Sequence, residues 1–111
     1  MSFLKPTRWR SEKHRRLVAS LDCIICGTSG RTQAAHRNEG KSMGMKACDS
    51  QMMALCVECH RWIDQGGKTD KATRRVMELS YVKATRKKMV DTGIWSAAAE
   101  AAYMKVTGEK T

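Results

Sequence analysis

Aromatic residues are scarce in this chain of 111 residues, which contains three Trp, two Tyr and one Phe. A chain of this length holds one domain with a thin core, in which the eight Met fill gaps that rings would otherwise fill. The scarcity also leaves little material for the stacking aromatics with which RNA-recognition sheets bind bases. We therefore expect a single domain over residues 1–111 and no RNA-recognition sheet.

Long apolar runs are also missing. No uninterrupted run approaches the ~20 residues that span a bilayer, which excludes a transmembrane protein and gives no reason to expect a membrane partner. Residues 1–6 include no apolar stretch of the kind found in secretory signals. The sequence therefore predicts a cytoplasmic protein.

Acidic residues are outnumbered, with 11 Asp and Glu against 21 Lys and Arg, and the net charge is +10. Such an excess favours a polyanionic partner, most simply a nucleic acid. A basic cluster near the N-terminus contains Arg8, Arg10, Arg15 and Arg16. This cluster has two interpretations, contact with phosphates or a solvated helix face.

Capping residues, glycines and apolar spacing predict an α+β chain in three parts. A basic N-terminal segment with a short helix covers 1–21, a central unit covers 22–67, and further helices cover 68–111. We expect helices over 12–21, 57–65, 70–92 and 97–106, and strands over 32–37 and 52–55. A second basic cluster, Lys83 to Lys88, is most simply a solvated face of the long helix.

Four of the five cysteines form two Cys-x-x-Cys pairs, Cys23 with Cys26 and Cys56 with Cys59. Structural disulfides are rare in a reducing cytosol, so paired cysteines there indicate a metal site. Two such pairs complete a tetrahedral Zn²⁺ site, which also stabilises a small core. We predict structural zinc at these four residues and expect Cys48 to be a small buried residue or a bystander thiol.

Two other interpretations of the cysteines are weaker. Cys56 to His60 matches the C-x-x-C-H pattern of c-type haem attachment, but that chemistry needs an oxidising compartment and leaves the first pair unused. A redox-active Cys-x-x-Cys motif likewise explains only one pair at a time. A shared zinc site explains both pairs together.

The histidines and acids around the second cysteine pair suit phosphodiester hydrolysis. His36 lies in a predicted strand, and His60 begins a predicted helix on which Asp64 follows at i+4, on the same face. Hydrolysis needs a general base with a pKa near neutrality and a divalent cation. We expect His36 to be the base, and His60 with Asp64 or Asp49 to hold Mg²⁺ or Mn²⁺. His14 is expected to be a structural or surface residue.

Several of these motifs together resemble the zinc-containing branch of the HNH (His-Asn-His, ββα-metal) endonucleases. The residues that carry the resemblance are Ala35-His36, the segment 44–49 and the segment 56–64, somewhat over a third of the chain. Within that superfamily, the sequence is similar to the small phage and prophage YbcO-like nuclease family. The resemblance implies a small zinc-stapled ββα-metal core, treble-clef-like, with flanking α-helices.

The resemblance also implies roles for individual residues. The general base of the family falls on His36, its helix-borne metal ligand on His60, and its acidic position before the second strand on Asp49. The zinc ligands fall on Cys23, Cys26, Cys56 and Cys59. One departure is Ala35, which stands where many members carry an Asp or His metal ligand.

The function predicted on this basis is a metal-dependent DNA endonuclease or nickase in a host bacterial cytoplasm. We expect phosphate contacts from the N-terminal cluster and from Arg37, Lys41, Lys46 and Arg61. A homodimer and phage recombination proteins are further partners compatible with such a nuclease. One alternative is a non-catalytic zinc-stabilised module that binds nucleic acid. Another is an adaptor in a phage recombination complex that uses the Met-rich segment 43–53.

Overall fold

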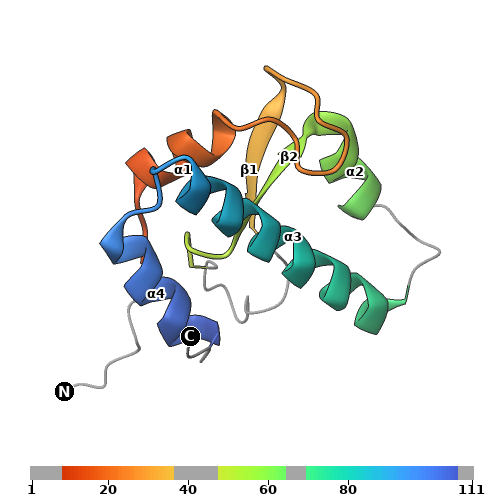
Figure 1. The fold of residues 1–111 in the computed structure, drawn as a ribbon. Coiled ribbons are helices and arrows are strands. Elements are labelled where there is room, and N and C mark those ends of the chain that lie inside the picture. The colour runs from red at the N-terminus through yellow and green to blue at the C-terminus, as the bar shows by residue number, and fades with distance from the viewer. Residues whose placement is uncertain (1–8, 37–47, 65–69, 108–111) are drawn as a thin grey trace.

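The computed structural model describes residues 9–36, 48–64 and 70–107. In chain order the elements are α1 (Glu12–Ala19), β1 (Thr32–His36), β2 (Met52–Cys56), α2 (Val57–Asp64), α3 (Lys71–Asp91) and α4 (Ala97–Thr107) (Figure 1). The described part of the chain is thus a small α+β structure with four helices and a two-stranded antiparallel sheet. All six predicted elements are confirmed. The predicted ends at residues 37 and 65 lie outside the described residues.

Side-chain caps fix where the helices begin, as the sequence predicted. The Ser11 hydroxyl accepts a hydrogen bond from the backbone N–H of His14 at 3.0 Å and caps α1. Ser96 caps α4 in the same way, by accepting from the backbone N–H of Ala99 at 3.0 Å. The last turn of α1 tightens, because the N–H of Leu21 donates to Val18 only three residues back. The helix therefore ends at Ala19, two residues before the predicted end.

The sheet has two covered faces, and α1 and α2 lie on opposite sides of it (Figure 1). One face packs against α2, α3 and α4 through Ala35, Met53, Leu55, Ile63, Val82 and Tyr103. The other face packs against α1 and α3 through Val18, Leu21, Met52, Ala54 and Met89. Successive strand residues point to opposite faces, so His36 shares the α1 face with Ala34, whereas Gln33 shares the α2 face with Ala35.

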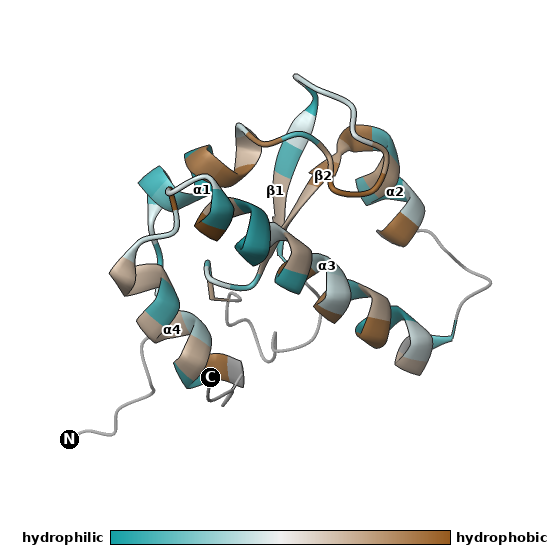
Figure 2. Cartoon of the chain, in the orientation of Figure 1, coloured by the Kyte–Doolittle hydropathy of each residue, from teal (hydrophilic) through white to brown (hydrophobic). Residues whose placement is uncertain are grey.

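Hydrophobic and hydrophilic residues alternate along the labelled helices (Figure 2). No helix in the described ranges is both long and apolar enough to cross a bilayer. Some large apolar side chains are nevertheless exposed, among them Trp62 on α2 and Val76 on α3. Single exposed apolar residues of this kind are common on protein surfaces.

An ion pair with two aromatic neighbours joins α3 to α4. Arg86 donates two hydrogen bonds to Glu100 Oε1 and one to Oε2, at 2.8–3.0 Å. The Trp95 indole N–H donates to Glu100 Oε1 at 2.7 Å, and the Arg86 guanidinium lies 4.8 Å from the centre of the Tyr103 ring. Arg86 was predicted as part of a solvated basic cluster, but in the structure its charge is satisfied within the fold.

A buried threonine of α3 satisfies the backbone of β2, and its removal is expected to destabilise the protein. Thr85 Oγ1 accepts from the Ala54 N–H at 3.1 Å and donates to the Tyr81 carbonyl at 2.8 Å. Thr85→Val leaves the Ala54 N–H buried without an acceptor, so we expect a loss of about 1–3 kcal/mol in the free energy of unfolding, measured by urea denaturation. Ser80→Ala is the control, because Ser80 is exposed and bonds only to the carbonyl of Met77. Equal losses in the two variants would contradict this role of Thr85.

Candidate metal centre and the buried Asp49 cluster

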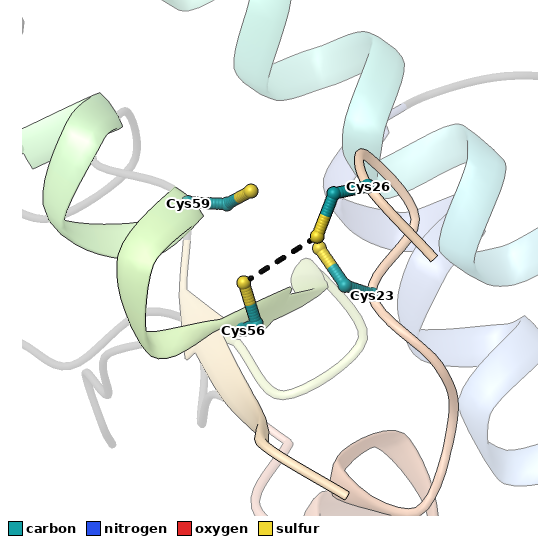
Figure 3. Close-up of side chains that lie close together, drawn as sticks. All are labelled: Cys23, Cys26, Cys56 and Cys59. Atoms are coloured by element: carbon teal, nitrogen blue, oxygen red, sulfur yellow. Dashed lines mark hydrogen bonds between the residues drawn. The ribbon is translucent and has the colours of Figure 1, made fainter. Parts of the chain in front are cut away.

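The four paired cysteines converge on one point, as Figure 3 shows. Cys23 and Cys26 lie in the turn after α1, Cys56 is the last residue of β2, and Cys59 lies in the first turn of α2. Their sulfur atoms all lie within 4.8 Å of one another, and those of Cys26 and Cys56 are 3.7 Å apart. A tetrahedral Zn²⁺ with Zn–S bonds of about 2.3 Å separates its sulfur ligands by about 3.8 Å. The four cysteines could therefore hold a metal ion such as Zn²⁺.

Backbone hydrogen bonds form the first knuckle and attach it to the sheet. The Cys23 N–H donates to the Thr28 carbonyl at 3.0 Å, and the Gly27 N–H donates to the Cys23 carbonyl at 2.9 Å. Gly27 has a φ of 80°, a conformation that glycine adopts without strain. The Ile24 N–H donates to the Ala54 carbonyl at 3.0 Å, which ties the knuckle to β2. The first pair is thereby held beside the strand that carries the third cysteine.

The electrostatics of the four thiols suit a cation. Burial acts to raise the pKa of Cys23, but hydrogen bonds from the Cys26, Cys56 and Ile25 backbones outweigh it and lower that pKa to about 6. Burial and the neighbouring sulfurs instead raise the pKa of Cys59. Four thiolates so close together repel one another, and a bound dication removes that repulsion.

The fifth cysteine lies outside this group. Cys48 is buried, and its sulfur is 3.1 Å from the Ser50 hydroxyl. The predicted role of a small buried residue is therefore consistent with its position. Within the described ranges, no second set of three or more His, Cys, Asp or Glu side chains lies close enough to share an ion.

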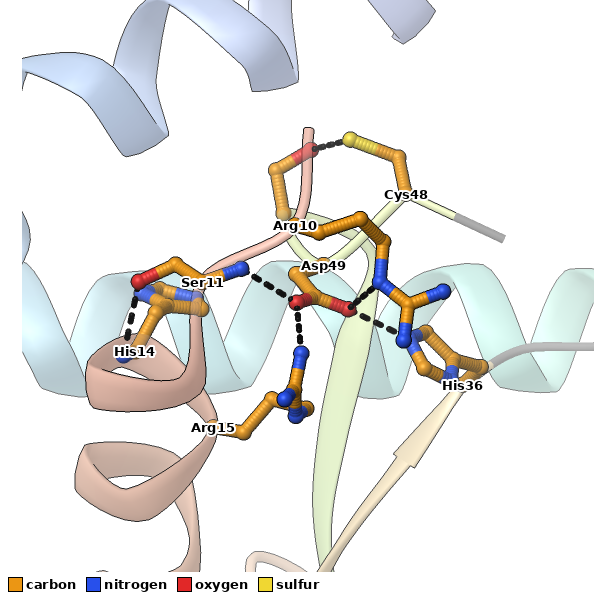
Figure 4. A network of polar contacts seen from close by, with 8 residues as sticks. Arg10, Ser11, His14, Arg15, His36, Cys48 and Asp49 are labelled. Carbon is orange, nitrogen blue, oxygen red and sulfur yellow. Dashed lines mark hydrogen bonds and ion pairs between the residues drawn. The ribbon is translucent and has the colours of Figure 1, made fainter. Parts of the chain in front are cut away.

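A second polar cluster surrounds Asp49, which precedes β2 (Figure 4). The carboxylate is fully buried, and its Oδ2 accepts from the Ser11 backbone N–H at 2.7 Å and from Arg15 Nη1 at 2.6 Å. Its Oδ1 lies 2.8 Å from His36 Nε2 and 3.7 Å from Arg10 Nε. Asp49 thus joins the start of α1 to the end of β1.

The charge of Asp49 determines how His36 is oriented. Burial acts to raise the pKa of Asp49, but the hydrogen bonds from Ser11, His36 and Arg15 outweigh it and lower that pKa. The carboxylate is therefore ionised at neutral pH and accepts hydrogen bonds only, so Nε2 of His36 is the donor in this contact. Among the described residues, Nδ1 of His36 has no hydrogen-bond partner. His36 is therefore held in place by a buried carboxylate through Nε2, which leaves Nδ1 outside that contact.

The lowered pKa predicts how stability depends on pH. A carboxyl group whose pKa is lower in the folded state stabilises the fold above its ordinary pKa of 3.8, and that contribution is lost as the pH falls through the folded-state value. Asp49→Asn removes the charge that Arg15 and His36 contact, and Arg15 is partly exposed, so we expect a loss of about 1–3 kcal/mol in the free energy of unfolding at pH 7. The difference from the wild type should shrink below about pH 4, as measured by urea denaturation at pH 7 and pH 3.

The matched control for this prediction is Asp91→Asn. Asp91 is exposed and pairs only with exposed Lys87, at 3.0 Å, so its loss should change stability little at either pH. A deficit in Asp49→Asn that is as large at pH 3 as at pH 7 would contradict the assigned role of the Asp49 carboxylate.

His60 lies apart from this cluster. Its Nδ1 is 2.8 Å from Gln33 Oε1, on the α2 face of the sheet, whereas His36 lies on the α1 face. Ala35 is buried on the same face as Gln33. Asp64 is the last residue of α2, and its side chain lies outside the described structure. The structure therefore brings Asp49 to His36, and it does not bring Asp49 or His36 to His60.

The predicted phosphate contacts have different surroundings. Arg10 and Arg15 belong to the Asp49 cluster, and Arg16 pairs with Glu12 at 2.6 Å on the exposed face of α1. Arg61 is exposed on α2. The other four residues, Arg8, Arg37, Lys41 and Lys46, lie outside the described residues.

Sequence reasoning missed the partners of Asp49. Ser11 and Arg15 lie more than thirty residues before it in the chain, and no local pattern connects them with Asp49. Comparison with known proteins adds no family to this geometry: no family model, curated protein or solved structure matches the chain.

Proposed function

We propose that this protein is a metal-dependent DNA endonuclease or nickase of the HNH type, of phage or prophage origin. The observation that carries the proposal is the pair formed by His36 and Asp49, an imidazole of a strand fixed at 2.8 Å by a fully buried carboxylate. A general base for hydrolysis near neutral pH needs an oriented imidazole of this kind. The net charge of +10 supports a nucleic acid as the substrate.

The arrangement of the cysteines supports a zinc-stapled ββα-metal core with treble-clef-like topology. One cysteine pair precedes the β1–β2 hairpin, and the other spans the junction of β2 and α2. Zinc at this position is structural, because all four ligands are cysteines and no coordination position is left for substrate. Such an ion fixes the hairpin to α2 and stabilises a core with few large side chains.

His36 and Asp49 have distinct roles in the proposed reaction. Nδ1 of His36 takes a proton from a water molecule whose oxygen forms a bond to phosphorus, while the bond from phosphorus to the leaving sugar oxygen breaks. Asp49 is a positioning residue: it holds the ring through Nε2 and stabilises the imidazolium that forms. Exposed basic residues would bind the neighbouring phosphates.

The family resemblance implies a divalent ion, Mg²⁺ or Mn²⁺, which would stabilise the charge on the transferred phosphate. The predicted ligands are His60 and Asp64, but the described residues supply only the imidazole of His60 on that face of the sheet. Ala35 offers no ligand atom, and both oxygens of Asp49 are occupied by protein donors. The described residues thus do not form the implied set of ligands for the divalent ion. The proton transfer to His36 and the positioning by Asp49 do not depend on these ligands.

A second candidate function is a non-catalytic zinc-stabilised module that binds nucleic acid. It is favoured by Ala35 and by the placement of His36 and His60 on opposite faces of the sheet. An adaptor that uses the Met-rich segment 43–53 has less support, because Met52 and Met53 are buried in the core.

The test is cleavage of supercoiled plasmid by zinc-loaded protein with Mg²⁺, with Mn²⁺ and with EDTA. Accumulation of nicked or linear DNA only with added ion would support the nuclease proposal. Binding that weakens steeply with salt, without cleavage under any metal, would instead support the binding module. Absence of both binding and cleavage would exclude the two candidates together.

A further inference from the structure

A cleft lies between the start of α1 and the connection from α3 to α4, away from the cysteines. Its volume is about 370 Å³, and its polar lining consists of Ser11, Lys13, His14 and Ser96. Leu17, Ile94 and Trp95 form an apolar wall. The volume falls within the ~300–1,000 Å³ of ordinary ligand sites. Nothing in the proposed hydrolysis uses this cleft.

One largely buried polar side chain that lines the cleft has no hydrogen-bond partner for its ring among the described residues. His14 is only 4% exposed, and its ring packs edge-on against Trp9 and Trp95, with centroid distances of 4.9 and 5.4 Å. Its ring nitrogens make no hydrogen bond with any described residue, and they are not among the fully shielded side-chain atoms without a partner, so they are accessible at the cleft that His14 lines. Burial lowers the pKa of His14 more than nearby Asp49 raises it. The ring is therefore neutral at neutral pH and carries one N–H donor.

Two helix N-termini meet at the same cleft. Ser11 is the N-cap of α1 and Ser96 caps α4, and both residues line the cleft. The positive ends of both helix dipoles and the Lys13 ammonium therefore lie at the same site.

The acids around the cleft are paired with arginines, including Glu12 of the first turn of α1, which is 2.6 Å from Arg16. No Asp or Glu lines the cleft. Asp49, which acts on His14 from nearby, is paired with Arg15, and Glu100, which accepts from Trp95, is paired with Arg86. Helix ends, a lysine, an imidazole N–H and two hydroxyls are the donors that proteins use for phosphate.

We propose that this cleft binds one backbone phosphate of the DNA and so positions the strand beside His36. The inference rests on the proposed function for the identity of the ligand. The cleft adjoins the proposed base through Ser11, because the Ser11 N–H donates to the carboxylate that holds His36. Lys13 supplies a positive charge and His14 supplies a neutral N–H donor for the phosphate. The N-termini of the two helices add the positive ends of their dipoles.

The first experiment compares Lys13→Gln with Lys105→Gln, the same charge change at an exposed lysine of α4 that does not line the cleft. Affinity for a DNA duplex is measured from 50 to 300 mM salt with zinc-loaded protein. Loss of one lysine–phosphate contact lowers the slope of log K against log salt by about 1. We expect this reduction in Lys13→Gln only. Equal slopes in both variants and the wild type would overturn the proposal.

The second experiment uses inorganic phosphate as the probe and NMR shifts of the Lys13 and Ala97 backbone amides as the signal. We expect these amides to shift more with phosphate than with chloride at equal ionic strength. The shifts should weaken in Lys13→Gln and in His14→Phe, which keeps a ring between the two tryptophans but removes the N–H donor. Shifts no larger than those with chloride would overturn the proposal.

The two experiments together separate the sources of phosphate. Phosphate-induced shifts combined with an unchanged DNA salt slope in Lys13→Gln would mean a site for free phosphate, which overturns a DNA contact. If the wild type bound no DNA at all, the proposed function would fail, and the DNA contact would fail with it. The NMR titration would then still report whether the cleft binds phosphate.

Discussion

Cys56→Ser is expected to remove the bound metal and, with it, cooperative unfolding. Cys56 is buried at the end of β2 and lies between the first cysteine pair and α2. Structural Zn²⁺ sites bind with apparent free energies of about 10–16 kcal/mol, which exceeds the net stability of many domains of this size. A serine hydroxyl is a poor substitute for a thiolate ligand. Metal content is measured by mass spectrometry and thermal unfolding by circular dichroism. We expect one zinc per chain in the wild type and none in Cys56→Ser.

The matched control is Cys48→Ala, a cysteine substitution at a buried position outside the metal group. This variant should keep one zinc per chain and lose only the stability that follows from a smaller side chain. Cooperative unfolding of Cys56→Ser without metal would contradict a metal-dependent fold. Loss of zinc in Cys48→Ala would contradict the assignment of the four ligands.

Local features of the fold were predictable from the sequence because they depend on short-range chemistry. Ser11, Asp70 and Ser96 cap helices through hydrogen bonds to backbone N–H groups three residues later. Gly93 follows α3 with a φ of 78°, which suits a helix end. The convergence of the four cysteines also followed from their spacing, since each Cys-x-x-Cys pair forms a turn whose two sulfurs point to one side.

The environment of Asp49 could not be predicted, because it depends on tertiary contacts between segments far apart in the chain. Arg15 and Ser11 reach Asp49 only because α1 packs on the α1 face of the sheet. The same packing places Asp49 next to His36 and not next to His60. Side chains alternate between the two faces of a strand, so His36 and Ala35 point to opposite faces of the sheet. A shift of one residue in the strand register would move each of them to the other face.

His14 shows how a tertiary contact can change the meaning of a sequence pattern. In the sequence it lies inside a basic run, and it was expected to be structural or at the surface. In the structure it is buried between two tryptophans, so it is not a surface residue. The pattern gave no sign of Trp95 as a neighbour, because that residue reaches α1 only after α3 has crossed the sheet.

The largest expected effect on activity is that of His36→Ala. If Nδ1 of His36 takes the proton from water, its removal should slow plasmid nicking by about 10²–10⁴-fold, the usual contribution of a general base. His36 is partly exposed, and Asp49 keeps its bonds to Ser11 and Arg15, so the variant should fold and bind zinc. Added imidazole should restore part of the rate, because a small base can occupy the space that the substitution leaves. A merely structural role would give no such rescue.

His60→Ala separates the two histidines, because they lie on opposite faces of the sheet. If His60 holds the divalent ion, this variant should need more Mg²⁺ or Mn²⁺ for half-maximal rate and should show no rescue by imidazole. His36→Ala should leave the metal dependence unchanged. Nicking by His36→Ala at the wild-type rate, with equal zinc content and DNA affinity, would rule out His36 as the base. Asp49 would then be a buried structural carboxylate, and the charge balance around it would serve stability alone.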